Sequence, residues 1–432
     1  MRGPNMQLCI IIFLLLGLSS VPNASSSAIR RGGVYKVNRV PNSNYNSRNG
    51  PQALLRALRK YGMPVPASVE HAAAVQDEIL AKRNAQERRL RAKGRRSQLC
   101  DEKSAGGKVG LVTAAPEADD VEYLSPVKIG GQTLNLGLDT GSADFFVFNT
   151  QLNEDATKWH AVYDPQKSRT YAPMEGASFH VSYSDGSSAS GTVGTDTVEL
   201  GGVTVTAQAI ELPTSVAPSF IHDTANDGLL GLAFGKLNGV RPNLQKTFFE
   251  NAVSSLAEPL FTADLRPKFV GAYEFGRIDS TKYTGPLSWV PVDPSEGLWQ
   301  FTSEFFAVNG SDFYWSTRGK PAIADTGTSL LLVDRAVTTA YYEQIAEAYE
   351  NPSAGGWVFP CNTPLPDLQL DVGGAIATIK GRDIRFAQSD EKNCYGGLQT
   401  ATGVQVFGDV FFKSNFVVFH GGNNSIGFAE HI

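Results

Sequence analysis

The sequence LGLDTGSADFFVF at Leu136–Phe148 has a second copy, AIADTGTSLLLV, at Ala322–Val333. In each copy an Asp-Thr-Gly follows a short apolar run and is itself followed by Ser or Thr. Far downstream of each copy, two apolar residues and a glycine recur as Leu229–Gly231 and Val406–Gly408. The sequence therefore contains an internal repeat, and we expect a protein built of two similar halves.

The residue types of the repeated motif suit the presentation of a carboxyl group. The aspartate ends a strand, and the glycine permits a sharp turn and the close approach of another backbone. The threonine is predicted to hydrogen-bond across the junction of the halves, and the final residue to place a hydroxyl group beside the carboxylate. The eight positions are Asp139, Thr140, Gly141 and Ser142 in the first copy, and Asp325, Thr326, Gly327 and Thr328 in the second.

Two carboxyl groups that lie close together cannot both ionise readily, so they share one proton. One then serves as general base toward a water molecule while the other donates a proton to a carbonyl oxygen. The sequence does not assign these two roles to Asp139 or Asp325. A single Asp-Thr-Gly would be read as an ordinary turn, but its repetition argues against that reading.

Composition favours a mostly β protein, and we expect it to use neither metal nor cofactor. The chain has 432 residues, 42% of them hydrophobic and 43 of them glycine, and runs rich in Val, Thr and Ser favour strands and turns. Helices are predicted at 50–62, 243–256 and 334–349, and a hairpin at 192–212 that turns at Gly201-Gly202. The histidines show no metal-ligand spacing and are interpreted as surface residues or as core residues with satisfied hydrogen bonds: His71, His160, His180, His222, His420 and His431.

Charge and targeting signals divide the chain. Residues 1–107 carry 18 Lys and Arg against 6 Asp and Glu, whereas residues 108–432 carry 20 against 37. Arg2 and the apolar run at Leu8–Leu18 predict a signal peptide over residues 1–28, and we expect no membrane anchor. A basic segment on an acidic body indicates a removable pro-segment or a nucleic-acid-binding arm, but the basic run 82–96 lacks the aromatic residues that stack on bases.

These motifs resemble those of the pepsin-type aspartic endopeptidases, most closely the filamentous-fungal branch. The similarity covers residues 109–432 and includes SYSDGSSASGTVGTDTV at 182–198, NDGLLGLAFG at 226–235 and VFGDVFFKSNFVVF at 406–419. The shared proton described above is the established behaviour of aspartic-protease dyads. The resemblance implies an all-β, bilobal, pepsin-like fold with few short helices, with lobes at 108–279 and 280–432 after a pro-segment at 29–107.

The resemblance also implies residues that bind a polypeptide substrate. A flap hairpin is expected at Tyr183, Ser184, Asp185 and Gly186, and an apolar primary pocket at Phe220 and Leu229. Asp185 is similar to the acid of fungal members that also accept lysine in that pocket. Two residues depart from the family pattern: Phe146 replaces the usual tryptophan, and Ser184 stands where many members have glycine.

Lys60-Tyr61 resembles the pair that occupies the cleft of such zymogens, with Lys60 paired to both aspartates. We expect acid-triggered self-cleavage between Arg96 and Val112, and a secreted monomer, with the vacuole as the alternative destination.

Cys361 and Cys394 suit a disulfide in an exported protein, with free buried thiols as the alternative. Further sequence patterns predict glycosylation at Asn309 and Asn423.

Two other functions remain to be compared with an active endopeptidase. A catalytically inactive relative could keep the bilobal fold for binding, although both motifs and the flap tyrosine are intact. A nucleic-acid binder would depend only on residues 82–96.

Overall fold

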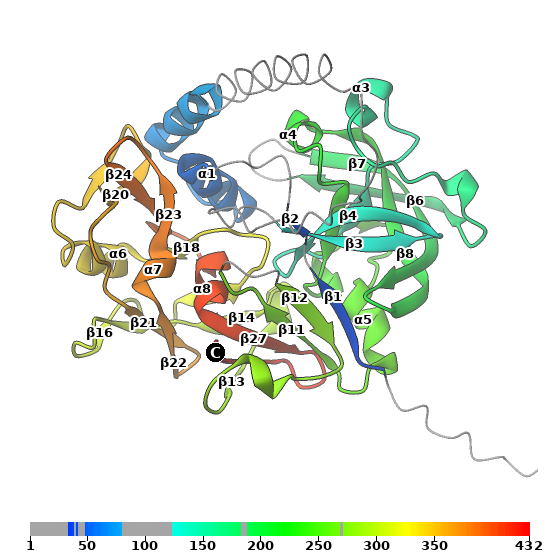
Figure 1. The fold of residues 1–432 in the computed structure, drawn as a ribbon. Helices are drawn as coiled ribbons and strands as arrows, with labels where there is room; N and C mark the ends of the chain where they lie inside the picture. The colour runs from blue at the N-terminus through cyan, green and yellow to red at the C-terminus, as the bar shows by residue number, and fades with distance from the viewer. Residues whose placement is uncertain (1–32, 39, 42–47, 80–122, 183–187, 268–270) are drawn as a thin grey trace, which may run out of the picture. The chain divides into compact units, whose positions relative to one another are not determined.

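The computed structural model describes residues 33–38, 40–41, 48–79, 123–182, 188–267 and 271–432. Within these ranges the strands form sheets of nine, six, five, four and four strands, and the helices are short (Figure 1). This architecture confirms the predicted all-β class. The signal peptide predicted at 1–28 lies outside the described residues, as do the basic run 82–96 and the expected cleavage region.

The repeated motif of the sequence is a repeated strand arrangement in the structure. In the first copy, β4 (Gln132–Asp139) runs parallel to β9 (Gly228–Gly231), and Asp139 pairs with Gly231. In the second copy, β17 (Pro321–Ala324) runs parallel to β26 (Gln405–Phe407). In both copies the next strand pairs antiparallel with the downstream strand; these strands are β5 (Phe145–Val147) and β18 (Leu331–Val333).

The first copy belongs to the nine-stranded sheet, whose order is β10-β6-β7-β8-β5-β9-β4-β3-β2. The predicted hairpin is formed by β7 and β8, and Gly201 and Gly202 turn it with positive φ angles of 60° and 99°, a conformation that glycine adopts without a steric cost. The remaining strands of this sheet are β2 (Val40–Pro41), β3 (Tyr123–Ile129), β6 (Ala172–Ser182), β7 (Ser188–Leu200), β8 (Val203–Val216) and β10 (Val240–Arg241).

A six-stranded sheet combines strands from both predicted lobes and from the N-terminal segment. Its order is β1-β12-β11-β27-β28-β13. One of its faces is apolar, and Phe261, Phe275 and Phe419 are fully buried there, with ring contacts between neighbouring strands. The strands are β1 (Tyr35–Asn38), β11 (Leu260–Asp264), β12 (Ala272–Phe275), β13 (Ser288–Pro291), β27 (Asn415–His420) and β28 (Ser425–Glu430).

The described part of the predicted pro-segment is integrated into this architecture. β1 pairs antiparallel with β12, and β2 pairs with β3. Helix α1 (Gly50–Lys60) begins at Asn49, whose side chain accepts the N–H of Gln52, and ends with two basic residues. Its apolar face, which includes Leu54, Leu55 and Leu58, packs against residues of the second half of the chain. Residues 67–79 are also helical.

Two predicted helices are shorter than expected. The helix predicted at 243–256 begins only at Phe248, as α5 (Phe248–Ala252), and continues as a 3-10 turn. Thr247 fixes this start, because it forms a capping box with Glu250. The helix predicted at 334–349 is α6 (Arg335–Tyr342). The other short helices are α3 (Glu154–Thr157), α4 (Pro218–His222), α7 (Gly381–Ile384) and α8 (Asp409–Ser414).

The second copy lies in the five-stranded sheet β14-β17-β26-β18-β25, beside two four-stranded sheets with the orders β16-β15-β21-β22 and β19-β20-β24-β23. Their other strands are β14 (Gln300–Thr302), β15 (Phe305–Val308), β16 (Tyr314–Trp315), β19 (Tyr349–Asn351), β20 (Gly356–Pro360), β21 (Leu368–Val372), β22 (Ala375–Ile379), β23 (Arg385–Gln388), β24 (Asn393–Gly396) and β25 (Leu398–Thr400).

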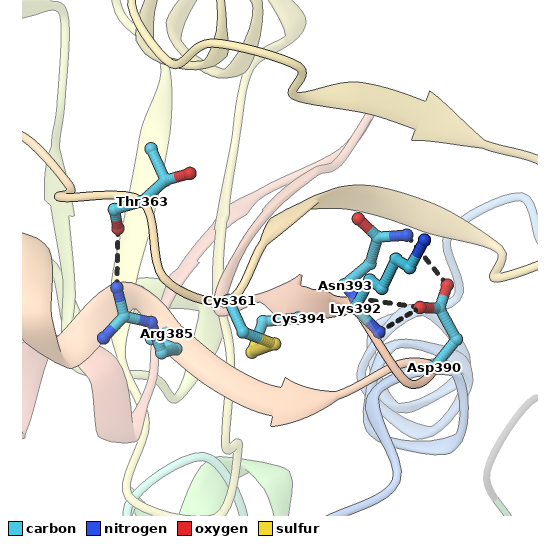
Figure 2. The surroundings of a disulfide bond; sticks show 7 residues. All are labelled: Cys361, Thr363, Arg385, Asp390, Lys392, Asn393 and Cys394. Carbon is cyan, nitrogen blue, oxygen red and sulfur yellow. Dashed lines mark hydrogen bonds between the residues drawn. A yellow bond between two sulfur atoms is a disulfide. The ribbon is translucent and has the colours of Figure 1, made fainter.

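Cys361 and Cys394 form the disulfide that the sequence predicts (Figure 2). It joins the chain after β20 to β24, beside a turn in which Asp390 accepts the backbone N–H groups of Lys392 and Asn393. The side chain of Arg385 donates to the carbonyl oxygen of Thr363 on the other side of the bridge.

Candidate active site

The two Asp-Thr-Gly motifs meet through reciprocal hydrogen bonds of their threonines. Thr140 Oγ1 donates to the carbonyl oxygen of Ala324 at 2.9 Å, and Thr326 Oγ1 donates to that of Leu138 at 3.0 Å. Each hydroxyl also accepts the backbone N–H of the other threonine, at 2.9 Å and 3.2 Å. This symmetric network of buried hydrogen bonds fixes the two strand ends against each other.

The network brings the carboxyl groups of Asp139 and Asp325 within hydrogen-bonding reach of each other. Asp139 is 3% exposed and Asp325 0% exposed. Each carboxylate accepts two further bonds from its own motif, one from a backbone N–H and one from a hydroxyl. The donors are Gly141 N (2.8 Å) and Ser142 Oγ (2.6 Å) for Asp139, and Gly327 N (2.9 Å) and Thr328 Oγ1 (2.5 Å) for Asp325.

The glycines of the two motifs are required by the closeness of the opposite carboxyl group. A Cβ atom on Gly327 would lie 2.4 Å from Asp139 Oδ1, and one on Gly141 would lie 2.6 Å from Asp325 Cγ. Side-chain carbon atoms do not tolerate such distances, so any larger residue would push the carboxyl groups apart.

The N-terminal segment places a cation between the two carboxylates. Lys60, the last residue of α1, donates from Nζ to Asp139 Oδ1 at 2.8 Å and to Asp325 Oδ2 at 3.0 Å and Oδ1 at 3.1 Å. The next residue, Tyr61, donates its hydroxyl to Asp325 Oδ2 at 2.6 Å. The lysine contact was predicted from the sequence; the tyrosine hydroxyl bond was not.

Comparison with known proteins agrees with this geometry. Residues 122–431 match the family model described as eukaryotic aspartyl protease. The chain belongs to the eukaryotic aspartyl protease family. The protease is 43% identical to an aspergillopepsin A-like aspartic endopeptidase of Aspergillus fumigatus over 97% of its own length and 98% of the relative's. It is 46% identical to penicillopepsin-1 of Penicillium janthinellum, over 74% of its own length and 98% of the relative's. It is 42% identical to endothiapepsin of Cryphonectria parasitica, over 92% of its own length and 90% of the relative's. The predicted resemblance to fungal pepsin-type enzymes is thereby confirmed, and the protein is an aspartic endopeptidase.

The surroundings separate the proton affinities of the protease's two aspartates while Lys60 is in place. Burial raises the pKa of Asp139, although the Lys60 charge opposes the shift. Burial acts to raise the pKa of Asp325 as well, but the Lys60 charge and hydrogen bonds from Asp139, Thr328 and Tyr61 lower it to about 2. Burial acts to lower the pKa of Lys60, and the two carboxylates more than compensate, so it stays charged. Asp325 is therefore the ionised partner in this state, and Asp139 is the one that takes up a proton more readily.

The two residues expected to line the primary pocket lie together beside Phe146. The ring of Phe220 contacts that of Phe146 edge-on, with centroids 5.2 Å apart. Leu229 is partly buried in the same apolar cluster. Phe146, which replaces the family's usual tryptophan, is 1% exposed and offers no N–H donor. The expected flap residues Tyr183, Ser184, Asp185 and Gly186 lie outside the described residues.

The two predicted glycosylation sites lie on turns. Asn309 and Asn423 are both exposed, at turns that follow β15 and β27. Within the described ranges, no group of three or more His, Cys, Asp or Glu side chains is placed to hold a metal ion. None of the described helices combines the length and apolar content needed to cross a bilayer.

The partners of one buried histidine of the protease could not be predicted from its sequence. His160 is a core residue, as expected, and both of its ring nitrogens face backbone carbonyl oxygens from the region that carries Phe220 and Leu229. No sequence motif signals this arrangement, because any residue can supply a carbonyl oxygen.

Proposed function

We propose that this chain is the precursor of a secreted endopeptidase in which Asp139 and Asp325 hydrolyse peptide bonds at acid pH. The observation that carries the proposal is the position of Lys60 Nζ, which reaches both carboxylates at 2.8 Å and 3.0 Å. A cation held by both groups marks the place where a water molecule would lie once the segment leaves.

The hydrolysis follows from a pair that holds one proton. The ionised aspartate takes a proton from the water, whose oxygen attacks the carbonyl carbon of the peptide, while the other aspartate donates its proton to the carbonyl oxygen. As the tetrahedral intermediate collapses and the C–N bond breaks, the aspartate that took the water's proton donates it to the leaving nitrogen, and the other aspartate takes back a proton from a hydroxyl group of the intermediate. Ser142 and Thr328 orient the carboxyl groups through the hydrogen bonds they donate.

The proposal treats residues 29–107 as an inhibitory pro-segment. Lys60 and Tyr61 fill the position of the catalytic water, and α1 adds an apolar contact through its leucines. Because the segment is basic and the body acidic, protonation of the body's carboxylates weakens the attraction. Removal of the segment between Arg96 and Val112, by the enzyme itself, would release the activity.

The pocket formed by Phe220 and Leu229 is proposed to favour large hydrophobic residues beside the cleaved bond. Asp185 is proposed to extend this preference to lysine. A peptide that contains Lys-Ile should then be cut, and the Asp185→Ser variant should lose that cleavage while it keeps cleavage after phenylalanine. Undiminished lysine cleavage by the variant would refute the role of Asp185.

Export and modification complete the proposal. The signal peptide and the disulfide Cys361–Cys394 suit an extracellular enzyme, with the vacuole as the alternative destination. Asn309 and Asn423 are proposed to carry glycans, and the enzyme to act as a monomer on polypeptides, without nucleic acid, cofactor or metal.

One experiment tests the function. The acid-treated protein should degrade denatured haemoglobin, and a statine-type inhibitor or the Asp139→Asn substitution should abolish the degradation. A folded protein that binds the inhibitor but cuts nothing would be an inactive relative. If the Asp139→Asn precursor matures in pure form at the normal rate, self-processing is wrong.

A further inference from the structure

The ring of His160 lies between two backbone segments of the first half of the chain. Nδ1 is 3.0 Å from the carbonyl oxygen of Asn226, and Nε2 is 3.2 Å from that of Ile221. The side chain is 1% exposed. One face of the ring stacks on Phe148, with centroids 3.7 Å apart and an interplanar angle of 10°.

This geometry requires both ring nitrogens to carry hydrogen. A carbonyl oxygen is only an acceptor, so each of the two contacts is a hydrogen bond only if the nitrogen donates. A neutral imidazole has one donor nitrogen, and its other nitrogen would direct a lone pair at a carbonyl oxygen. The ring is therefore an imidazolium, and its stacking on a buried phenylalanine is a favourable cation–π contact.

The acidic group beside the ring is Asp227, which in turn feels the charge of Asp223. Asp227 Oδ1 lies 4.0 Å from Nδ1. Burial raises the pKa of Asp227, against backbone N–H bonds from Asn135 and Ala161 and the charge of His160. If Asp227 takes up a proton in acid, the imidazolium still has its two carbonyl partners.

Both carbonyl groups belong to segments that carry the pocket residues. Ile221 follows Phe220 in α4, and both side chains pack on the cluster that contains Phe148. Asn226 precedes β9, which contains Leu229 and pairs with the strand that ends at Asp139. A ring that holds both carbonyl groups therefore sets how far apart the two pocket residues lie.

We propose that His160 is a positioning residue for specificity, whose doubly protonated ring holds Phe220 and Leu229 at the spacing that accepts a large apolar side chain. This inference depends on the proposed function, in which these two residues form the primary pocket. Loss of either hydrogen bond would release one of the two segments, so the preference for large residues should decline when the ring donors are removed.

The test is the ratio of kcat/KM for two peptides that differ only in Phe or Ala at the residue before the cleaved bond. Ionisation of the catalytic pair and loss of active enzyme affect both peptides equally, so they cancel in this ratio. At about pH 4 we expect removal of the two ring donors to lower this ratio roughly five- to tenfold, the effect of about one lost hydrogen bond. A ratio that does not change would overturn the proposal.

The His160→Phe variant keeps the stacking on Phe148 but removes both donors. Its ratio at about pH 4 should show this roughly five- to tenfold decrease. His420→Phe is the matched control, because His420 lies in β27 and contacts Trp289; this variant should keep the unaltered ratio. If His160→Phe keeps the unaltered ratio, His160 does not position the pocket.

A second measurement does not require activity. In the Asp139→Asn precursor with ¹⁵N-labelled histidine, nuclear magnetic resonance should show that both His160 nitrogens carry hydrogen at about pH 4. A neutral His160 at acid pH would overturn the inference even if the enzyme cuts peptides. Conversely, an unaltered protein that cuts no peptide would refute the proposed function, and the resonance experiment would still decide the protonation of His160.

Discussion

Replacement of Lys60 by methionine should release activity from the intact precursor. The lysine side chain is 14% exposed and donates three hydrogen bonds to two carboxylates that are 4% and 0% exposed. Removal of one partner of a buried ion pair costs about 3–5 kcal/mol. The lower end applies here, because the aspartates left behind can share a proton and Tyr61 still donates to Asp325. A change of about 3 kcal/mol corresponds to about 150-fold in the equilibrium between closed and open precursor.

The assay is the initial rate of cleavage of a small fluorogenic peptide at about pH 6, where Asp325 of the closed form is still ionised. The precursor must remain uncut on a gel throughout. Glu70→Gln is the control, since it breaks the ion pair between Arg59 and Glu70, in which Glu70 is 52% exposed; such surface pairs contribute less than about 1 kcal/mol, or about fivefold. If Lys60→Met and Glu70→Gln release the same small activity, the lysine does not hold the segment on the active site.

Three further predictions concern acid, a motif glycine and the disulfide. The pKa of Asp325 is lowered from 3.8 to about 2, so the ionised carboxylate stabilises the closed precursor at every pH above 3.8. This stabilisation is lost as the pH falls from 3.8 to about 2, and the precursor should open faster. Opening rates measured by stopped flow that do not change over this pH range would contradict the prediction. Gly327→Ala should lower kcat more than about 100-fold, because its Cβ would lie 2.4 Å from Asp139 Oδ1, and misplacement by about 1 Å has that effect; normal kcat in a folded variant would contradict this. Cys361→Ser with Cys394→Ser should lower the free energy of unfolding by about 3–4 kcal/mol, measured by denaturant titration, and an unchanged midpoint would contradict the contribution of the bridge.

Local patterns in the sequence were sufficient for the repeated motif and its consequences. The all-β class, the hairpin at Gly201-Gly202 and the two strands that end in Asp139 and Asp325 follow from short apolar runs and turn residues. The start of α5 was placed five residues too early, because the capping box of Thr247 was not recognised.

Long-range partners could not be predicted from the sequence. The pairing of β1 with β12 joins segments more than two hundred positions apart, and neither strand carries a signal that names the other. His160 is a stronger case, because its partners are main-chain carbonyl groups. Such groups are present at every residue, so only the fold determines which two of them face the ring.

The reciprocal threonine bonds between the motifs determine when the chain can act on a peptide. Each half of the chain supplies one carboxyl group, and neither half alone can pass a proton from water to substrate. Hydrolysis therefore requires the contacts between the halves, and in the folded chain Lys60 lies across the carboxyl pair. A molecule whose halves have not yet met lacks the pair, and in the folded molecule Lys60 covers it.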